Sequence, residues 1–418
     1  LAPGPAGDIL RSPEVLPSGR NLYQFDPRQV PSPSALQRGA QIAENTLREH
    51  LGVHGRYPES VAVVLWGLET AQTHGETIGQ VLAYLGVRLS RAHGPWEHRV
   101  EAIPLAELGR PRVDVTIQIC GFFRDMFPQA LALVQDAVTL VGNLEESDES
   151  NHVRRSAARL RPELQAQGLA ADEAHELALA RVFGPAAAEY GTHLTRIVGD
   201  SAWKAESDLV AAYLASLQHV YTRRRHGESI QGLLTANLRH VELVSQIRSS
   251  RDYEITDLDH YYEFYGGLAR SVEEASGRRA MLLISDTQQG RARTESVERA
   301  IQRGVRTRLL NPKWLEAMLG HEHHGGQQIA GRVENLLGLA ATTKAVSAPI
   351  FDEVSDRLVL DGAMRTRLQQ NNPYALLSVL ERLLEAHRRG YWAAGSQRIE
   401  QMERIYLDLE VHLEGSVE

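Results

Sequence analysis

The sequence predicts an α/β portion, with parallel strands and flanking helices, followed by a larger and mostly α-helical portion. Two stretches have the pattern of buried strands, 61–66 ("VAVVLW") and 113–119 ("VDVTIQI"), and each is followed by a stretch of helical spacing. A repeated strand–loop–helix order is typical of an α/β layer. Beyond about residue 160, apolar residues recur at threes and fours along most of the chain, which indicates helices.

Three parts are therefore expected. Residues 1–34 are rich in Pro, Gly and Ser without a sustained period, which predicts an extended segment. Because the chain begins at Leu1 rather than at Met, we expect part of a longer protein, with a natural linker as the alternative. Residues 35–160 are expected to form the α/β domain, and residues 161–418 the helix-rich domain with one strand near 280–287.

The individual helices are predicted from the same spacing. In the α/β part they are expected at 35–51, 75–87 and 128–141. In the helix-rich part the predicted stretches are 172–182, 204–221, 232–248, 259–276, 295–303 and 374–389.

Composition limits the classes of function. A chain of 418 residues with 43% hydrophobic and 23% charged residues is typical of a globular protein with a large core. A net charge of −8 gives no basic footprint for nucleic acid. Cys120 is the only cysteine, which favours a reducing compartment, and no apolar run reaches the roughly 18–20 residues of a membrane span. We expect a cytoplasmic protein without a nucleic-acid partner or a membrane span.

The loops after the two predicted strands carry the first candidate site. Ligands of open α/β sheets bind outside the carboxyl ends of the strands, which here are the loops 66–76 and 120–127. Glu69, His74 and Glu76 lie in the first of them, and imidazole and carboxylate groups can bind a divalent cation or transfer protons. The alternative is that Glu76 offsets a helix dipole while His74 is exposed.

A second candidate is the acidic stretch 143–155 ("NLEESDESNHVRR"), which contains Glu146 and Asn151. Clustered carboxylates can accept protons or a metal, and an acidic surface loop is the alternative. Asp286 follows the strand near 280–287 and could be a polar ligand or a helix cap. The chain has no Gly-x-x-x-x-Gly-Lys-Ser/Thr phosphate loop and no Gly-x-Ser-x-Gly hydrolase motif.

Several stretches, in order from one end to the other, resemble the large subunit of the ATP-dependent tetrapyrrole metal chelatases. This family comprises the CobN-type cobaltochelatase and the magnesium chelatase H subunit. The most specific stretches in combination are "GRNLYQFDP", "GFFRDMF", "YYEFYGGL" and "NPKW". The resemblance covers essentially the whole chain and roughly the C-terminal third of a typical family member.

The resemblance implies insertion of a metal into a tetrapyrrole. The large subunit would hold the macrocycle and the metal, while two partner subunits of the AAA+ class hydrolyse ATP, which agrees with the missing phosphate loop. The first hypothesis is a cobaltochelatase that inserts Co²⁺ into hydrogenobyrinate a,c-diamide in cobalamin biosynthesis. The alternative is insertion of Mg²⁺ into protoporphyrin IX in chlorophyll and bacteriochlorophyll biosynthesis.

The resemblance also implies site residues. The family pattern keeps an acid at Glu76, which favours Glu76, whereas the position of His74 varies. With the residues of the two loops, the catalytic candidates are Glu76, Glu146 and His74, and the metal candidates are Glu76, His74 and Glu69. The candidates for tetrapyrrole binding are Arg20, Asn21, Arg124, Asp125, Asn151 and His321. Arg20 and Arg124 suit the carboxylate side chains of a macrocycle. Ser147 replaces a proline of the family pattern, which makes the geometry around Glu146 less certain.

Two stretches depart from the family pattern. In "GHEHHGGQQ" (320–328) only His321 and Gly325 match, so we expect a loop between helices rather than a metal site. The stretch 219–230 ("HVYTRRRHGESI") differs from the expected Tyr- and Gly-rich segment. This second departure motivates a tetrapyrrole-binding module without catalysis as a competing function, and an unrelated metallohydrolase is a third hypothesis.

Overall fold

The computed structural model describes residues 26–91, 98–250, 252–288 and 290–414. The chain divides into two compact units. Unit 1 comprises Leu1–Gly191 and His219–Ile230, and unit 2 comprises Thr192–Gln218 and Gln231–Glu418. The division thus lies about thirty residues after the boundary expected at 160, and a short later segment returns to unit 1.

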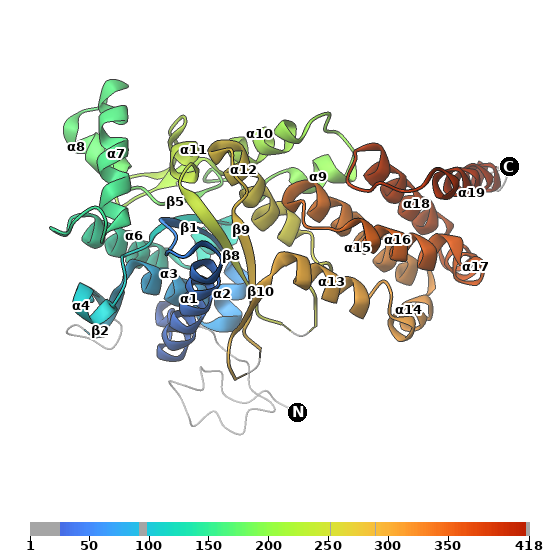
Figure 1. Cartoon of the computed structure of the whole chain (residues 1–418), viewed down its shortest axis with the longest axis horizontal. Helices are drawn as coiled ribbons and strands as arrows, with labels where there is room; N and C mark the ends of the chain where they lie inside the picture. The colour runs from blue at the N-terminus through green and yellow to red at the C-terminus, as the bar shows by residue number, and fades with distance from the viewer. Residues whose placement is uncertain (1–25, 92–97, 251, 289, 415–418) are drawn as a thin grey trace, which may run out of the picture. The chain divides into compact units, whose positions relative to one another are not determined.

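Unit 1 is an α/β structure, and its helices and strands are coloured from blue to green in Figure 1. Its helical elements are η2 (Pro27–Gln29), α1 (Pro33–His54), α2 (Gly67–Thr73), α3 (Glu76–Leu85), α4 (Leu105–Leu108), α5 (Gly121–Met126), α6 (Pro128–Gly142), α7 (His152–Ala166) and α8 (Ala171–Ala178). Its strands are β1 (Ser60–Leu65), β2 (Val87–Arg91), β3 (His98–Ala102), β4 (Asp114–Ile119), β5 (Val182–Gly184), β6 (His219–Tyr221) and β7 (His226–Ser229).

The sheet of unit 1 has the strand order β1-β4-β5-β6-β7. β1 and β4 pair in parallel, with Ser60 opposite Asp114 and Leu65 opposite Ile119. Every residue of these two strands is buried, as expected for strands covered on both faces. α3 packs on both strands and α1 packs on α3, while β2 and β3 form a separate antiparallel pair. The predicted parallel α/β layer is therefore confirmed.

Unit 2 contains the mostly helical portion that the sequence predicts (Figure 1). Its helices are α9 (Leu194–Gly199), α10 (Glu206–Leu217), α11 (Leu233–Leu238), α12 (Gly267–Ser276), α13 (Val297–Thr307), α14 (Pro312–Leu319), α15 (Glu322–Thr343), α16 (Ala348–Ser355), α17 (Gly362–Asn371), α18 (Pro373–Arg388) and α19 (Ser396–Glu414). Two π-helical segments, η3 (Tyr261–Gly266) and η4 (Asp356–Leu360), directly precede α12 and follow α16, respectively.

Unit 2 also contains the strands β8 (Val241–Arg248), β9 (Met281–Asp286) and β10 (Arg293–Ser296). β8 and β9 are parallel, and β10 is antiparallel to β9. β9 confirms the strand expected near 280–287. The prediction of a helix over 232–248 is wrong, because only Leu233–Leu238 is helical and the chain then forms β8.

The histidine-rich stretch forms the beginning of a helix rather than the expected loop. α15 begins at Glu322, so Gly325 and Gly326 lie inside it. A Cβ atom on residue 325 would lie 1.8 Å from the Met318 carbonyl oxygen, so glycine lets the first turn of α15 pack on α14. His321, which precedes the helix, is exposed.

No described helix combines the length and the apolar composition that crossing a bilayer requires.

Candidate functional site

The carboxyl ends of β1, β4 and β5 form one edge of the sheet in unit 1, which we call the carboxyl edge. The parallel register brings the ends of β1 and β4 to the same level, and β5 is parallel to β4. Cys120 links two of these strand exits, because its Sγ accepts hydrogen bonds from the backbone N–H groups of Gly67 and Phe123, both at 3.4 Å. This edge is where an open α/β sheet binds ligands.

Glu69 is a buried acid on α2 at this edge, with 2% of its surface exposed. The hydroxyl groups of Thr73 and Thr77 donate hydrogen bonds of 2.9 and 3.0 Å to its two carboxylate oxygens. Burial, with a smaller contribution from the nearby Glu76 carboxylate, raises the pKa of Glu69 to about 8. Glu69 therefore holds a proton at neutral pH and can exchange it near that pH.

Glu76 lies at the start of α3, after Gly75 with a φ of 96°. Its backbone N–H donates to Thr73 Oγ1 at 3.1 Å, and its Oε1 lies 3.1 Å from Arg38 Nε on α1. Arg38 can reach it because α1 packs closely on α3. A Cβ atom on Gly39 would lie only 2.5 Å from the carbonyl oxygen of Glu76.

His74 turns the chain between α2 and α3. Its φ of 54° is left-handed, and its carbonyl oxygen accepts a hydrogen bond from Ser32 N–H at 3.0 Å. Across the described parts of the chain, no three side chains of His, Cys, Asp or Glu are grouped so that they could hold a metal ion. The structure thus brings Glu69 and Glu76 together but does not add His74 as the third ligand of a metal centre.

Glu146 and Asn151 lie at the opposite edge of the same sheet. Glu146 pairs with Arg112 at 2.8 Å, and Asn151 Nδ2 donates to Glu146 Oε2 at 2.9 Å. Arg112 precedes β4 and is 1% exposed, whereas the carboxyl edge follows Ile119. A six-residue strand spans about 20 Å. The sequence-predicted catalytic set is therefore divided between two edges, and Asn151 caps α7.

Arg124 and Asp125, on α5, do lie at the carboxyl edge. Arg124 Nε donates to Asp125 Oδ1 at 2.7 Å, which lowers the pKa of Asp125. Arg124 Nη1 donates to the carbonyl oxygens of Ala186 and Glu189 at 2.7 and 3.2 Å. The hydroxyl of Tyr190 donates to Asp125 Oδ2 at 2.7 Å. The guanidinium of Arg124 thus holds the loop after β5.

The remaining predicted residues lie elsewhere. Arg20 and Asn21 are outside the described residues. His321 belongs to unit 2, where it precedes α15.

Several residues at the carboxyl edge are not among the candidates from the sequence, and they include the following four. Thr73 and Thr77 are two of them, although their spacing of four and eight residues from Glu69 could have indicated them. Phe122 and Tyr190 are the other two, and no pattern in the sequence indicates their exposure.

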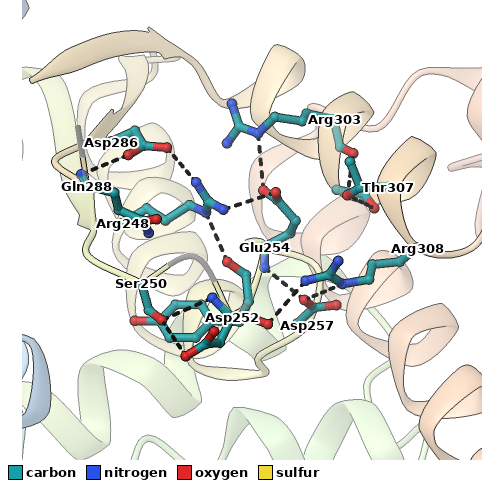
Figure 2. A network of polar contacts seen from close by, with 12 residues as sticks. Arg248, Ser250, Asp252, Glu254, Asp257, Asp286, Gln288, Arg303, Thr307 and Arg308 are labelled. Carbon is teal, nitrogen blue, oxygen red and sulfur yellow. Dashed lines mark hydrogen bonds and ion pairs between the residues drawn. The ribbon is translucent and has the colours of Figure 1, made fainter. Parts of the chain in front are cut away.

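Unit 2 has a charged network of its own at the carboxyl ends of β8 and β9 (Figure 2). Figure 2 shows Arg248 between Asp286 and Glu254, and Arg248 Nη2 lies 3.0 Å from Glu254 Oε1. Arg303 also pairs with Glu254, at 3.1 Å. Asp257, with 2% of its side chain exposed, accepts from Arg308 at 2.9 Å. These three acids are thus each paired with a guanidinium group.

Comparisons with known proteins give a consistent result. The family model for CobN/Magnesium Chelatase matches residues 1–399. The chain is 37% identical over 407 residues to the aerobic cobaltochelatase CobN subunit of Sinorhizobium sp, covering 95% of this chain and 31% of the relative. It is 36% identical over 416 residues to the magnesium-chelatase H subunit of Cereibacter sphaeroides, covering 99% of this chain and 34% of that relative.

A solved structure, the catalytic subunit of cobaltochelatase from Mycobacterium tuberculosis, has a TM-score of 0.89 and 34% sequence identity. The match covers 97% of this chain and 34% of that chain. The chain thus spans about a third of the length of the proteins that it matches.

Proposed function

Since the chain belongs to the CobN/magnesium chelatase family, we propose that it takes part in inserting a divalent metal ion into a tetrapyrrole, with the carboxyl edge of unit 1 as the site of the chemistry. The observation that carries this proposal is the pair of acids, Glu69 and Glu76, beside the end of β1. The metal and the macrocycle are both substrates in this proposal.

The two acids suit the proton transfers that metal insertion requires. A metal-free macrocycle loses two pyrrole N–H protons as the cation enters its plane, and a positioned carboxylate can accept such protons. Glu76 is proposed as the first base. Glu69, whose pKa of about 8 lies near neutral pH, is proposed to exchange protons with it or with solvent.

Arg38 forms an ion pair with Glu76 that an arriving metal ion would disturb. Arg38 Nε lies 3.1 Å from Glu76 Oε1. A dication that approaches Glu76 would repel the guanidinium of Arg38 and compete for the same carboxylate. We therefore propose that the Arg38–Glu76 pair opens when the metal ion arrives.

Glu146 has a different role in this proposal. Its bidentate contact with the buried Arg112 and its bond from Asn151 favour a structural function at the opposite edge. The same holds for Asn151 as the cap of α7. The role proposed for His74 is that of a turn residue at the carboxyl edge.

The first candidate reaction is insertion of Co²⁺ into hydrogenobyrinate a,c-diamide, as in cobalamin biosynthesis. The CobN relative and the solved cobaltochelatase structure support it. The alternative is Mg²⁺ and protoporphyrin IX, which the magnesium-chelatase relative supports at nearly the same identity. ATP would be hydrolysed by AAA+ partner subunits, since the sequence has no phosphate loop of the Walker type.

The test is a reconstituted reaction. The protein is mixed with the AAA+ subunits of each branch, ATP, and either Co²⁺ with hydrogenobyrinate a,c-diamide or Mg²⁺ with protoporphyrin IX. Absorbance reports the metallated product. Product with only one of the two combinations of metal and macrocycle supports the proposal and assigns the chain to the cobalt or the magnesium reaction. Binding of a macrocycle without product in either reaction would instead support a non-catalytic tetrapyrrole-binding module.

A further inference from the structure

Four exposed apolar side chains gather at the carboxyl edge of unit 1. Eight large apolar side chains are exposed in the described parts of the chain, and half of them lie at the exits of β1, β4 and β5. These four are Leu68 (65% exposed), Phe122 (38%), Met126 (37%) and Tyr190 (57%). Apolar side chains that gather on an exposed surface mark an interaction site more often than scattered ones do.

Two of the four are aromatic rings that lie against glycine at the start of a helix. A Cβ atom on Gly67 would lie 2.0 Å from Cδ1 of Phe122, and one on Gly121 would lie 2.5 Å from Cδ1 of Tyr190. Any larger residue at either position would displace its ring. Glycine at these two positions therefore lets each ring contact the backbone directly.

The ring of Tyr190 is also fixed from its other end. Its hydroxyl donates to Asp125 at 2.7 Å, and the guanidinium carbon of Arg124 lies 5.4 Å from the ring centroid. Arg124 in turn donates to the carbonyl oxygens of Ala186 and Glu189 in the same loop. An exposed ring that is already held in one orientation loses little conformational freedom when a ligand binds to it.

We propose that Leu68, Phe122, Met126 and Tyr190 form an apolar platform that binds one flat face of the metal-free tetrapyrrole. This inference rests on the proposed function and deepens it. The macrocycle is the occupant because the platform lies at the ends of β1, β4 and β5, the edge of the sheet that also carries the proposed acid site on α2 and α3. A large conjugated ring stacks on aromatic side chains.

The same geometry changes the role of Arg124 and Asp125. The sequence predicted that Arg124 contacts the carboxylates of the macrocycle. In the structure its Nε and Nη1 groups bind Asp125 and two carbonyl oxygens. Arg124 and Asp125 are therefore positioning residues, which act on the macrocycle through Tyr190.

The platform is tested by titrating the protein with metal-free protoporphyrin IX and, separately, with hydrogenobyrinate a,c-diamide, while absorbance is followed. Phe122→Ala combined with Tyr190→Ala is expected to raise the Kd for the preferred macrocycle at least about tenfold. Tyr190→Phe, which removes only the hydroxyl, is expected to raise it about threefold. Tyr374→Ala, at a tyrosine of α18 that is 59% exposed, is the matched control and leaves the Kd unchanged.

Folding is checked by thermal unfolding of each variant. If the double variant unfolds, Leu68→Gln replaces it, because a side chain that is 65% exposed on a helix tolerates glutamine. Leu68→Gln is expected to raise the Kd about threefold without lowering Tm.

The positioning role has a separate test. Arg124→Gln is expected to raise the Kd in the wild-type background and to have no effect when Tyr190 is already alanine. An effect of equal size in both backgrounds would mean that Arg124 contacts the macrocycle itself, which would overturn the positioning role.

The remaining outcomes separate this inference from the proposed function. Platform variants that bind the macrocycle like the wild type would overturn the platform and leave the proposed function intact. Variants that lose only stimulation by the AAA+ subunits would show that the platform binds a protein, which also overturns it. A wild-type protein that binds neither macrocycle and makes no product would overturn the proposed function and the platform together.

Discussion

Acids follow parallel strands in both units, but their partners differ. At the carboxyl ends of β8 and β9 in unit 2, Glu254 and Asp257 are paired with arginines (Figure 2). At the carboxyl edge of unit 1, Glu69 is bound by two hydroxyl groups. A carboxylate between guanidinium groups cross-links the fold, whereas burial keeps the proton on Glu69 near neutral pH. This difference supports the proposal that the edge in unit 2 is structural and that the edge in unit 1, where Glu76 has Arg38 as its ion-pair partner, carries the chemistry.

The largest loss of stability at a single pH is expected from Asp257→Asn. Its carboxylate contacts Arg308 at 2.9 Å and Arg332 at 2.6 Å, and only 2% of the side chain is exposed. Removing the negative charge leaves two guanidinium groups without their anionic partner, which is expected to lower the free energy of unfolding by about 3 kcal/mol. Urea unfolding measures the change, with Asp408→Asn on the exposed face of α19 as the control.

A network that contributes nothing to stability would give the same unfolding midpoint for both of these variants. That result would remove the contrast between the two units, because the arginine-paired acids would then be available for another role.

Glu146→Gln is expected to have the next largest effect on the free energy of unfolding. It weakens the contact with Arg112, which is 1% exposed, while Glu146 itself is 15% exposed in its side chain. The partial exposure of Glu146 reduces the expected cost to about 2 kcal/mol. Metal insertion per folded molecule is expected to stay at the wild-type rate. A loss of turnover without a loss of stability would instead support the catalytic role that the sequence predicted.

Glu69→Gln tests the protonated acid through the pH dependence of stability. Folding raises the pKa of Glu69 from 4.5 to about 8. The contribution of Glu69 to the free energy of unfolding is therefore most favourable below pH 4.5 and declines as the pH rises to about 8. Each pH unit in this window costs the wild type about 1.4 kcal/mol. Gln does not titrate, so the variant gains stability over the wild type between these two pH values, and the gain then levels off.

Thermal unfolding at several pH values measures this difference, with Glu44→Gln at an exposed position of α1 as the control. A difference in Tm that does not change between about pH 5 and pH 8 would show that Glu69 is charged in the folded protein.

His74→Gly is expected to have the smallest effect. The φ of 54° favours glycine, so the substitution relieves backbone strain in the folded protein. Glycine also gives the unfolded chain more conformational freedom, so the free energy of unfolding is expected to rise by only about 0.5 kcal/mol. His54→Gly, at the helical end of α1, should instead lose about 1 kcal/mol. Both variants are compared by urea unfolding. Loss of metal insertion in His74→Gly would restore His74 as a functional side chain.

The sequence predicted those parts of the fold that have long uninterrupted patterns. β1 and β4 were predicted because each is a continuous apolar or alternating run, as buried strands require. β8 was missed because its buried residues Val241, Val244 and Ile247 are spaced as on a helix. It is a strand because it pairs with β9, which lies about forty residues further along the chain.

In the candidate site, too, contacts between residues far apart in the sequence could not be predicted. Glu69 and Glu76 could be predicted because they follow a strand closely in the sequence. The contact of Tyr190 with Asp125 joins residues 65 positions apart, and no local pattern indicates it. The separation of Glu146 from Glu76 likewise depends on the direction of β4, which places Arg112 before the strand and the carboxyl edge after it.

The most direct test of a catalytic carboxyl edge is the rate of metal insertion by Glu76→Gln in the reconstituted chelatase, compared with Glu44→Gln. Both replace a glutamate that pairs with an arginine of α1, but only Glu76 lies at the carboxyl edge. We expect Glu76→Gln to lower kcat per folded molecule at least about a hundredfold, the effect of removing a catalytic base, with macrocycle affinity near that of the wild type. Glu44→Gln is expected to retain full activity. Equal rates for the two variants would contradict the proposed chemistry and move it away from this edge.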